Sequence, residues 1–250
     1  MGERKYFDCG VEIGIRRIMN PGSFYETTEL LRKMKYYGIE KALAYHSLST
    51  GYHPATGNDI LMEQVADIPE LLPCWVVMPH HTGEFPEPQA LRQSMKRRGV
   101  RAVKMCPANH GYSTAEWNCG ELFSMLAQCK APLTLGYDQT SPDAVHNILE
   151  NHPGLVIILT NLPNGCARNV YPLLKKFPEL YLETIGFKPL EGVEDVCEKF
   201  GAGRLIFGSG APLYSGGAAI GMLSYASISE EEKDMIAHKN LEQLLERVSL

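Results

Sequence analysis

The sequence predicts an α/β fold in which eight parallel strands alternate with helices and close into a single barrel. Three observations support this fold class. Short apolar, strand-like runs recur eight times, roughly 25–35 residues apart, and helical patterns lie between them. The chain has 250 residues, the usual length of one (β/α)8 TIM-like barrel, regular or distorted. No linker or low-complexity stretch interrupts it, so residues 1–250 are predicted to form one domain.

The predicted strands are mostly continuous apolar runs and not alternating ones. This composition is typical of parallel strands that are covered on both faces. The eight runs begin near residues 6, 42, 73, 101, 132, 155, 180 and 204.

The predicted helices are marked by their spacing and by their ends. Leu30, Leu31 and Met34 recur at helical spacing and so indicate one buried face. Several helices end in basic residues followed by glycine, which takes a left-handed cap that other residues resist. These glycines are Gly38, Gly99 and Gly201. Each one precedes a predicted strand, as an alternating α/β order requires.

The composition limits the classes of function. The net charge of −5 gives no overall basic field for nucleic acid or for an anionic membrane surface. No apolar stretch approaches the ~20 residues of a membrane span, and residues 1–5 do not begin a signal peptide. The seven cysteines form no C-x-x-C pair, which favours reduced thiols. We therefore expect a cytoplasmic protein with a small-molecule ligand, and the sequence leaves a homodimer open.

Polar side chains gather where the predicted strands end, which is where barrels of this class place their active sites. Glu12 follows the first strand, His46 the second and His80 the third. Lys104 lies on the fourth strand, and Asn161 follows the sixth. These five residues are the polar candidates for a site at one mouth of the barrel.

Motifs along almost the whole chain resemble the amidohydrolase family, in its branch of metal-dependent hydrolases and decarboxylases. Asp8 stands where that family begins its first strand with D-x-H-x-H. Further matching segments are 99–104 (strand 4), 132–135 (strand 5), 152–155 (strand 6), 204–209 (strand 8), 229–233 and 240–245. The resemblance implies the same barrel fold and a small-molecule enzyme.

The positions that the resemblance assigns to metal ligands hold residues that do not suit a metal. The two histidines of strand 1 correspond to Gly10 and Glu12, and the strand 5 histidine to Gly136. Asn161 replaces the strand 6 histidine, and Gly210 replaces the strand 8 aspartate, which resembles the general base. A divalent ion needs three or more converging N or O ligands. We therefore expect no metal and no other cofactor.

Roles for the remaining groups follow from their chemistry. Glu12 is either a catalytic acid or base, with His46 or His80 assisting, or the partner of Lys104 in a structural ion pair. Lys104 is expected to hold a substrate carboxylate, and Asn161 to donate or accept a hydrogen bond. The three glycines at vacated positions, Gly10, Gly136 and Gly210, are expected to line an enlarged binding pocket.

Three functions remain open at this point. The first is a hydrolase-like or lyase-like enzyme that acts on a small carboxylated metabolite without a metal. The second is a non-catalytic barrel that binds a metabolite or a partner through the same mouth. The third is a metal-dependent hydrolase whose ligands have moved to other positions.

Overall fold

The computed structural model describes residues 4–250, so the first three residues of the segment read for a signal peptide lie outside it. Eight parallel strands form one sheet in sequence order, which confirms the predicted (β/α)8 barrel. The strands are β1 (Tyr6–Ile13), β2 (Ile39–His46), β3 (Leu71–Val76), β4 (Ala102–Met105), β5 (Leu133–Gly136), β6 (Ile157–Thr160), β7 (Leu180–Glu183) and β8 (Leu205–Ile206). Each begins within three residues of its predicted start.

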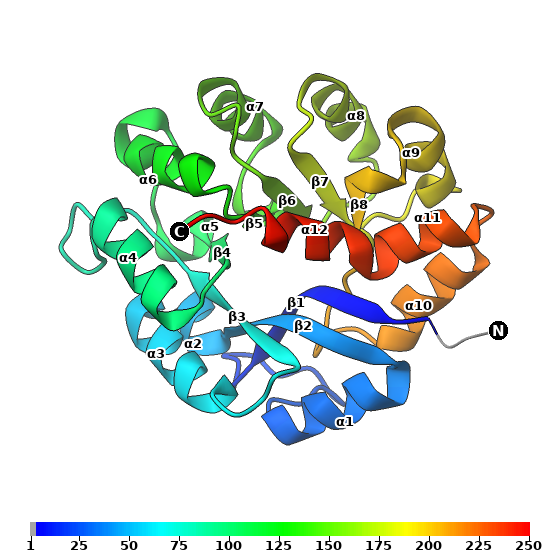
Figure 1. Ribbon diagram of the computed structural model, residues 1–250, viewed down its shortest axis with the longest axis horizontal. Coiled ribbons are helices and arrows are strands. Elements are labelled where there is room, and N and C mark those ends of the chain that lie inside the picture. Colours follow the sequence, from blue (N-terminus) through cyan, green and yellow to red (C-terminus); the bar gives the residue numbers. More distant parts are fainter. Residues whose placement is uncertain (1–3) are drawn as a thin grey trace.

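Helices connect the strands and surround the barrel (Figure 1). The α-helices are α1 (Thr27–Tyr37), α2 (Ser47–Gly51), α3 (Pro54–Val65), α4 (Pro88–Arg98), α5 (Pro107–His110), α6 (Glu116–Cys129), α7 (Pro142–Asn151), α8 (Ala167–Lys176), α9 (Gly192–Phe200), α10 (Gly216–Tyr225), α11 (Glu230–Asp234) and α12 (Asn240–Glu246). Two short 3-10 helices, η1 (Tyr137–Gln139) and η2 (Ala202–Arg204), and a short π-helix, η3 (Met235–Lys239), complete the set of described helices.

Two helix ends show why the strands start where they do. Gly38 ends α1 with a φ of 71°, and Gly99 ends α4 with a φ of 69°. Both values lie in the left-handed region, which an L side chain occupies only at a cost. The glycine therefore stops each helix and turns the chain into the next strand, as the sequence predicted.

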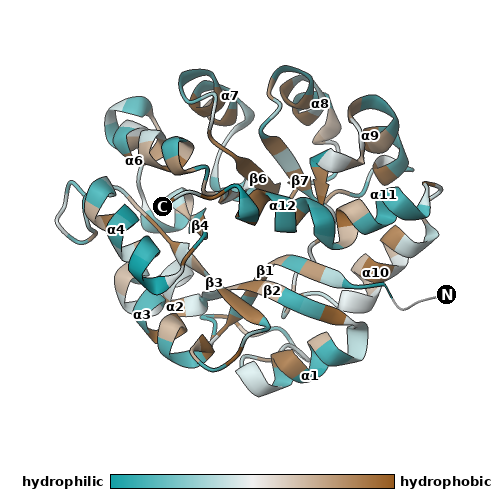
Figure 2. Cartoon of the chain, in the orientation of Figure 1, coloured by the Kyte–Doolittle hydropathy of each residue, from teal (hydrophilic) through white to brown (hydrophobic). Residues whose placement is uncertain are grey.

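The core has two layers. Apolar side chains between the strands and the outer helices form the larger layer, which includes Leu30 and Met34 of α1. A smaller cluster fills the inside of the barrel, where Phe7, Leu43 and Ile158 meet side chains of α12 such as Leu241. The strands are accordingly the most hydrophobic part of the chain, while polar residues lie on the outer helices (Figure 2). All seven cysteines are buried and unpaired.

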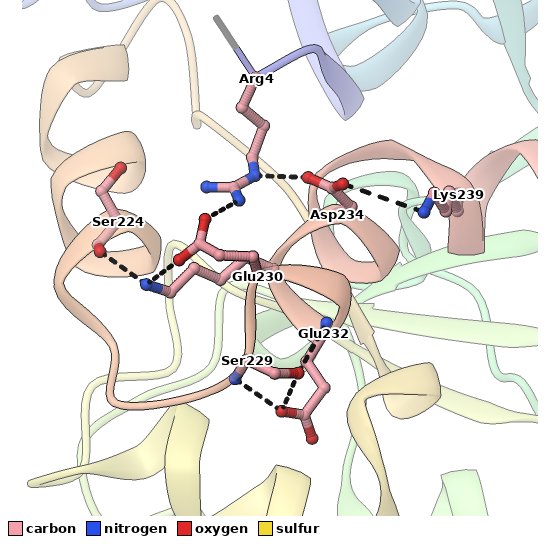
Figure 3. A network of polar contacts seen from close by, with 8 residues as sticks. Arg4, Ser224, Ser229, Glu230, Glu232, Asp234 and Lys239 are labelled. Atoms are coloured by element: carbon pink, nitrogen blue, oxygen red, sulfur yellow. Dashed lines mark hydrogen bonds and ion pairs between the residues drawn. The ribbon is translucent and has the colours of Figure 1, made fainter. Parts of the chain in front are cut away.

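The C-terminal helices α11 and α12 cross the amino end of the barrel (Figure 1). Arg4, just before β1, donates from Nε to Asp234 at 2.7 Å and from its guanidinium to Glu230 at 2.6 Å (Figure 3). Ser229 and Glu232 form a capping box at the start of α11. Because this end is covered, the carboxyl ends of the strands form the open mouth.

Within residues 4–250, no helix combines the length and the apolar character that a membrane crossing needs.

Candidate functional site

The inner wall of the mouth can be located from the two-residue period of the strands. Ala102 of β4 belongs to the cluster inside the barrel, so Lys104, two residues later, faces inward as well. By the same period Thr160 follows Ile158 on β6, and Glu183 follows Tyr181 on β7. On β5, Leu133 and Leu135 belong to the outer layer, so Thr134 between them faces inward. Four neighbouring strands, β4 to β7, thus each place a polar side chain on the inner face.

Lys104 is the cation of this wall. Its Nζ lies 4.6 Å from the centre of the Tyr45 ring, and no carboxylate of the described residues lies within ion-pair distance. Burial alone would lower the pKa of Lys104, but Tyr45, two thiols and Glu183 around it raise that pKa above its ordinary value. Lys104 and Tyr45 both stay partly exposed to solvent. The Lys104 ammonium is therefore charged and lies on the inner wall of the barrel.

Glu183 is the acidic group of the wall and is only 4% exposed. A Cβ at Gly208 would lie 2.2 Å from its Oε1, so that glycine makes room for the carboxylate. The Cys9 thiol donates to Oε1 at 3.9 Å, and the Asn161 amide donates to Oε2 at 3.4 Å. Burial, and then the nearby Asp8, raise the pKa of Glu183 to about 7. This carboxyl can accept or release a proton near neutral pH.

Asp8 joins the first and last strands. Its Oδ1 accepts a hydrogen bond from the Gly10 amide at 3.0 Å, and its Oδ2 accepts one from the Ser209 amide at 3.0 Å. Burial raises the pKa of Asp8 to about 6, although these hydrogen bonds lower it. Asp8 is fully buried, so we assign it the position of the strand ends and no contact with substrate.

Two hydroxyls on the inner wall have no hydrogen-bond partner among the described residues. They belong to Thr134, the register partner of Lys104 on β5, and to Thr160 on β6. Both are buried. Buried hydroxyls are nearly always hydrogen-bonded in folded proteins, so these two unpaired groups are candidates for contact with a ligand.

Glu12 lies at the end of β1 but does not face Lys104. It forms an ion pair with Arg16, and its Oε1 accepts a hydrogen bond from Thr50 at 2.9 Å. The structural ion pair between Glu12 and Lys104 considered from the sequence is therefore wrong, because Glu12 pairs with Arg16. Glu12 and Arg16 line a cleft of about 410 Å³ at the edge of the mouth, together with Tyr52.

The two histidine candidates lie in different environments. His46 ends β2 and is 8% exposed; its Nδ1 accepts a hydrogen bond from the Leu48 amide at 3.1 Å, and burial lowers its pKa. Its ring lies where Gly14 leaves space. His80 lies after β3, with Nε2 3.8 Å from Glu121 of α6. Neither ring forms a contact with Lys104 or Glu183 among those described.

The three glycines differ in how much space they leave. An added Cβ at Gly10 would meet Tyr45 at an ordinary contact distance of 3.5 Å. At Gly136 it would lie 2.5 Å from Asp138. At Gly210, whose φ is 66°, it would lie 2.6 Å from Tyr214. Side chains already occupy the space beside Gly136 and Gly210, so the enlarged pocket expected there is not found. Only Gly10 has its neighbouring side chain at an ordinary contact distance.

Asn161 lies at the rim and not on the wall. Its backbone is left-handed, with a φ of 54°, and its side-chain amide donates to Asp138 at 2.9 Å. Through its backbone amide it reaches Glu183. Asn161 thus links the rim to the acidic group of the wall.

Among the predicted residues, the structure groups Gly10 and Lys104 around Tyr45, and it brings Asn161 to Glu183. It does not bring Glu12, His46 or His80 to the same point. From the sequence, Glu183 at the end of strand 7 could equally face inward or serve as a cap or ion-pair partner, and neither it nor Tyr45 was selected as a site residue. The sequence could have indicated both, because each is a polar residue that directly follows a run of apolar residues at the end of a predicted strand.

A family model described as "Amidohydrolase" matches residues 25–247. The chain belongs to the amidohydrolase family. No curated protein matches its sequence. Solved structures are similar over nearly the full length of both chains, at sequence identities that establish the fold alone.

Three of these structures show the extent of the likeness. An uncharacterized TIM-barrel protein from Bordetella bronchiseptica is 16% identical with a TM-score of 0.76, covering 97% of this chain and 99% of that one. A 2,6-dihydroxybenzoate decarboxylase from Rhizobium is 15% identical with a TM-score of 0.73, covering 98% and 99%. A 5-carboxyvanillate decarboxylase from Sphingomonas paucimobilis is 13% identical with a TM-score of 0.74, covering 99% of each chain.

The family resemblance implies a divalent metal, and the residues at the mouth do not fit one. Within residues 4–250, no three His, Cys, Asp or Glu side chains lie close enough to share an ion. Glu12 is held by Arg16, while Gly10 and Gly210 have no side chain to offer. The charged ammonium of Lys104 would also repel a second cation. We therefore derive no step through a metal.

Proposed function

We propose that this chain is an amidohydrolase-family enzyme that hydrolyses a labile ester or lactone of a small carboxylated metabolite without a catalytic metal. One observation carries the proposal. The inner wall holds a charged ammonium without a carboxylate partner, two hydroxyls without a partner and a carboxyl with a pKa near neutrality. Buried polar groups are costly when they serve only the fold, so such a set indicates a ligand site.

Lys104 supplies the anion contact. Its ammonium attracts a carboxylate at the floor of the mouth, where the low dielectric strengthens the interaction. The Thr134 and Thr160 hydroxyls are available for further hydrogen bonds to substrate oxygens. The two similar decarboxylases are named for carboxylated aromatic compounds, which supports a carboxylated substrate for this chain as well.

Glu183 supplies the proton transfer. Its carboxylate takes a proton from water, and the water oxygen bonds to the substrate carbonyl carbon. The bond from that carbon to the alkoxy oxygen then breaks, and Glu183 returns the proton to the departing oxygen. In this proposal Glu183 on β7 takes the place of the general base that the family keeps at the position of Gly210, after the end of β8.

Glu12, His46 and His80 receive other roles in this proposal. Glu12 positions Arg16 at the edge of the mouth, because its carboxylate is already engaged by Arg16 and Thr50. His46 fixes the start of α2 through its hydrogen bond to Leu48. His80 lies on the rim after β3, so only a substrate large enough to extend to the rim contacts it.

The test compares two carboxylates that flank β7: Glu183 at its carboxyl end and Glu179 just before its amino end. Glu183→Gln should lower turnover of carboxylated esters and lactones by ~10²–10⁴ and keep the fold, because it removes a positioned base. Glu179→Gln, at the amino end of β7, removes a carboxylate that pairs with Arg247 and should leave turnover unchanged. Rates for a panel of such compounds and circular dichroism of each variant provide the measurement.

The same protein, purified without chelators, distinguishes the alternatives. Turnover unchanged by Glu183→Gln would contradict the role of Glu183. One metal ion per chain, lost together with activity on chelation, would favour the metal-dependent enzyme with relocated ligands. Binding of carboxylated compounds without any turnover would favour the non-catalytic barrel.

A further inference from the structure

A second pocket lies outside the barrel wall, apart from the mouth. It has a volume of about 250 Å³ and lies between the β1–α1 connection, α1 and the β8–α10 connection. Val11 of β1 forms part of its inner wall. The Val11 side chain belongs to the outer core layer, whereas Cys9, two residues earlier on β1, belongs to the cluster inside the barrel. The strand itself therefore separates this side pocket from Lys104.

The walls of the side pocket are mostly apolar. α1 contributes Leu30 and Met34, both almost fully buried, and the two connections contribute Phe24, Pro212 and Leu213. Volumes of ~300–1,000 Å³ are usual for sites of drug-sized ligands. The smaller volume of the side pocket suits a ligand with a short chain or a single ring.

One cation lies at the side pocket. Lys33 lines it from α1 and is half-buried. Among residues 4–250 Lys33 has no hydrogen bond or ion pair, whereas Arg32 beside it is paired with Glu29. The other polar groups are neutral, including the hydroxyls of Tyr37 and Ser215, which lie 3.0 Å apart. The side pocket therefore suits a ligand that carries one negative charge.

The wall near α10 is shaped by two glycines. A Cβ at Gly216 would lie 2.9 Å from the Tyr37 ring, and one at Gly217 would lie 3.3 Å from it. The start of α10 therefore approaches α1 more closely than it could if Gly216 and Gly217 carried side chains. The side pocket has a wall fixed by backbone packing on this side, as a preformed ligand site requires.

We propose that the side pocket binds a small amphipathic monoanion, an acid with a short apolar body and a single carboxylate. The apolar body lies against Phe24, Met34 and Pro212, where its burial contributes the main stabilisation. The carboxylate lies at Lys33, which forms no ion pair among residues 4–250, although Glu29 on the same helix lies near enough for the two charges to interact. A phosphate dianion fits less well, because the side pocket offers one cation and neutral hydroxyls.

The experiment measures hexanoate binding to the full chain by calorimetry, with hexan-1-ol as the uncharged comparison. We expect saturable binding of one hexanoate at the side pocket and weaker binding of the alcohol. Lys33→Gln should weaken hexanoate binding about five- to tenfold, because it removes the cation. Lys35→Gln is the matched control: Lys35 lies on the same helix, is exposed and is not part of the side pocket.

Lys104→Met separates the side pocket from the mouth. Hexanoate binding kept in Lys104→Met and weakened in Lys33→Gln supports the proposal. Binding lost in Lys104→Met and kept in Lys33→Gln would place hexanoate in the mouth and overturn it. Equal affinity for hexan-1-ol, or no hexanoate binding at millimolar concentration, would overturn it as well.

Discussion

At the amino end of the barrel, charged side chains lie in pairs. Arg4 meets Glu230 and Asp234, and the half-exposed Arg247 meets Glu179 at 2.7 Å. Lys233 is 8% exposed, yet its ammonium donates both to Glu230 and to the backbone oxygen of Ser224 (Figure 3). Arg4, Lys233 and Arg247 each have a carboxylate within ion-pair distance, and the side chains of Glu230 and Asp234 remain open to water.

At the carboxyl end the arrangement is different. Lys104 has an aromatic face and no carboxylate in ion-pair distance, and Glu183 has a thiol and one backbone amide. An ion that loses water without gaining a partner destabilises the folded state. In our proposal the ion pairs at the amino end hold α11 and α12 in place, whereas Lys104 and Glu183 at the mouth are kept for a ligand.

The largest effect is expected at Lys104. Lys104→Met should weaken binding of 2,6-dihydroxybenzoate, used as a probe carboxylate, about 10- to 100-fold, since a hydrogen bond to a charged group contributes ~1.5–3 kcal/mol. The folded state should keep its stability, because a buried cation is replaced by an apolar side chain of similar length. Lys233→Met at the other end should do the reverse, lowering stability and leaving the affinity unchanged. Calorimetric binding and urea unfolding of both variants measure these effects. If Lys104→Met bound 2,6-dihydroxybenzoate as tightly as the wild type does, Lys104 would not be the anion contact.

The next effect is a pH dependence of opposite sign at the two ends. The pKa of Glu183 is raised from 4.5 to about 7, so between these values the native state binds more protons than the unfolded state. Stability from this group is full below about pH 4.5 and decreases as the pH rises through 7, by ~3 kcal/mol for a shift of about 2.5 units. Arg4 lowers the pKa of Glu230, so the stability from that pair is present at neutral pH and is lost as the solution becomes acidic.

Urea unfolding between pH 4 and 8 measures both slopes. In Glu183→Gln the decrease between pH 4.5 and 7 should become smaller, leaving the part due to Asp8, whose pKa is raised to about 6. Glu230→Gln should reduce only the loss on the acid side. If the free energy of unfolding of the wild type rose steadily from pH 4.5 to 7, the pKa of Glu183 would not be raised in the folded state.

The smallest effect is expected at the amino end. Arg247→Gln removes one ion pair with Glu179, and both side chains are partly exposed. Such pairs usually contribute ~0–1 kcal/mol, so the midpoint of unfolding should move little and turnover should not change. A loss of activity in this variant would show that the two ends are coupled.

The strand order and the helix ends could be predicted from sequence because they depend on local chemistry. Glycine at a left-handed φ ends a helix wherever it occurs, as at Gly38 and Gly99. The inward direction of Glu183 depends instead on the register of a four-residue strand, which no periodicity defines. The partner of Glu12 depended on the path of the chain after β1. Arg16 stood four residues away in the sequence, but only the folded loop turns it toward that carboxylate.

The barrel closes at an irregular joint, and this has a consequence for its motions. β8 has two residues, while β5 and β6 share four register pairs. β1 meets the chain after β8 through the Cys9 and Glu12 amides, which donate to the carbonyl oxygens of Phe207 and Ala211, and through Asp8. A ring with one weak joint opens there first, by local fluctuation and without global unfolding. We expect such opening to admit water beside Cys9 and Glu183.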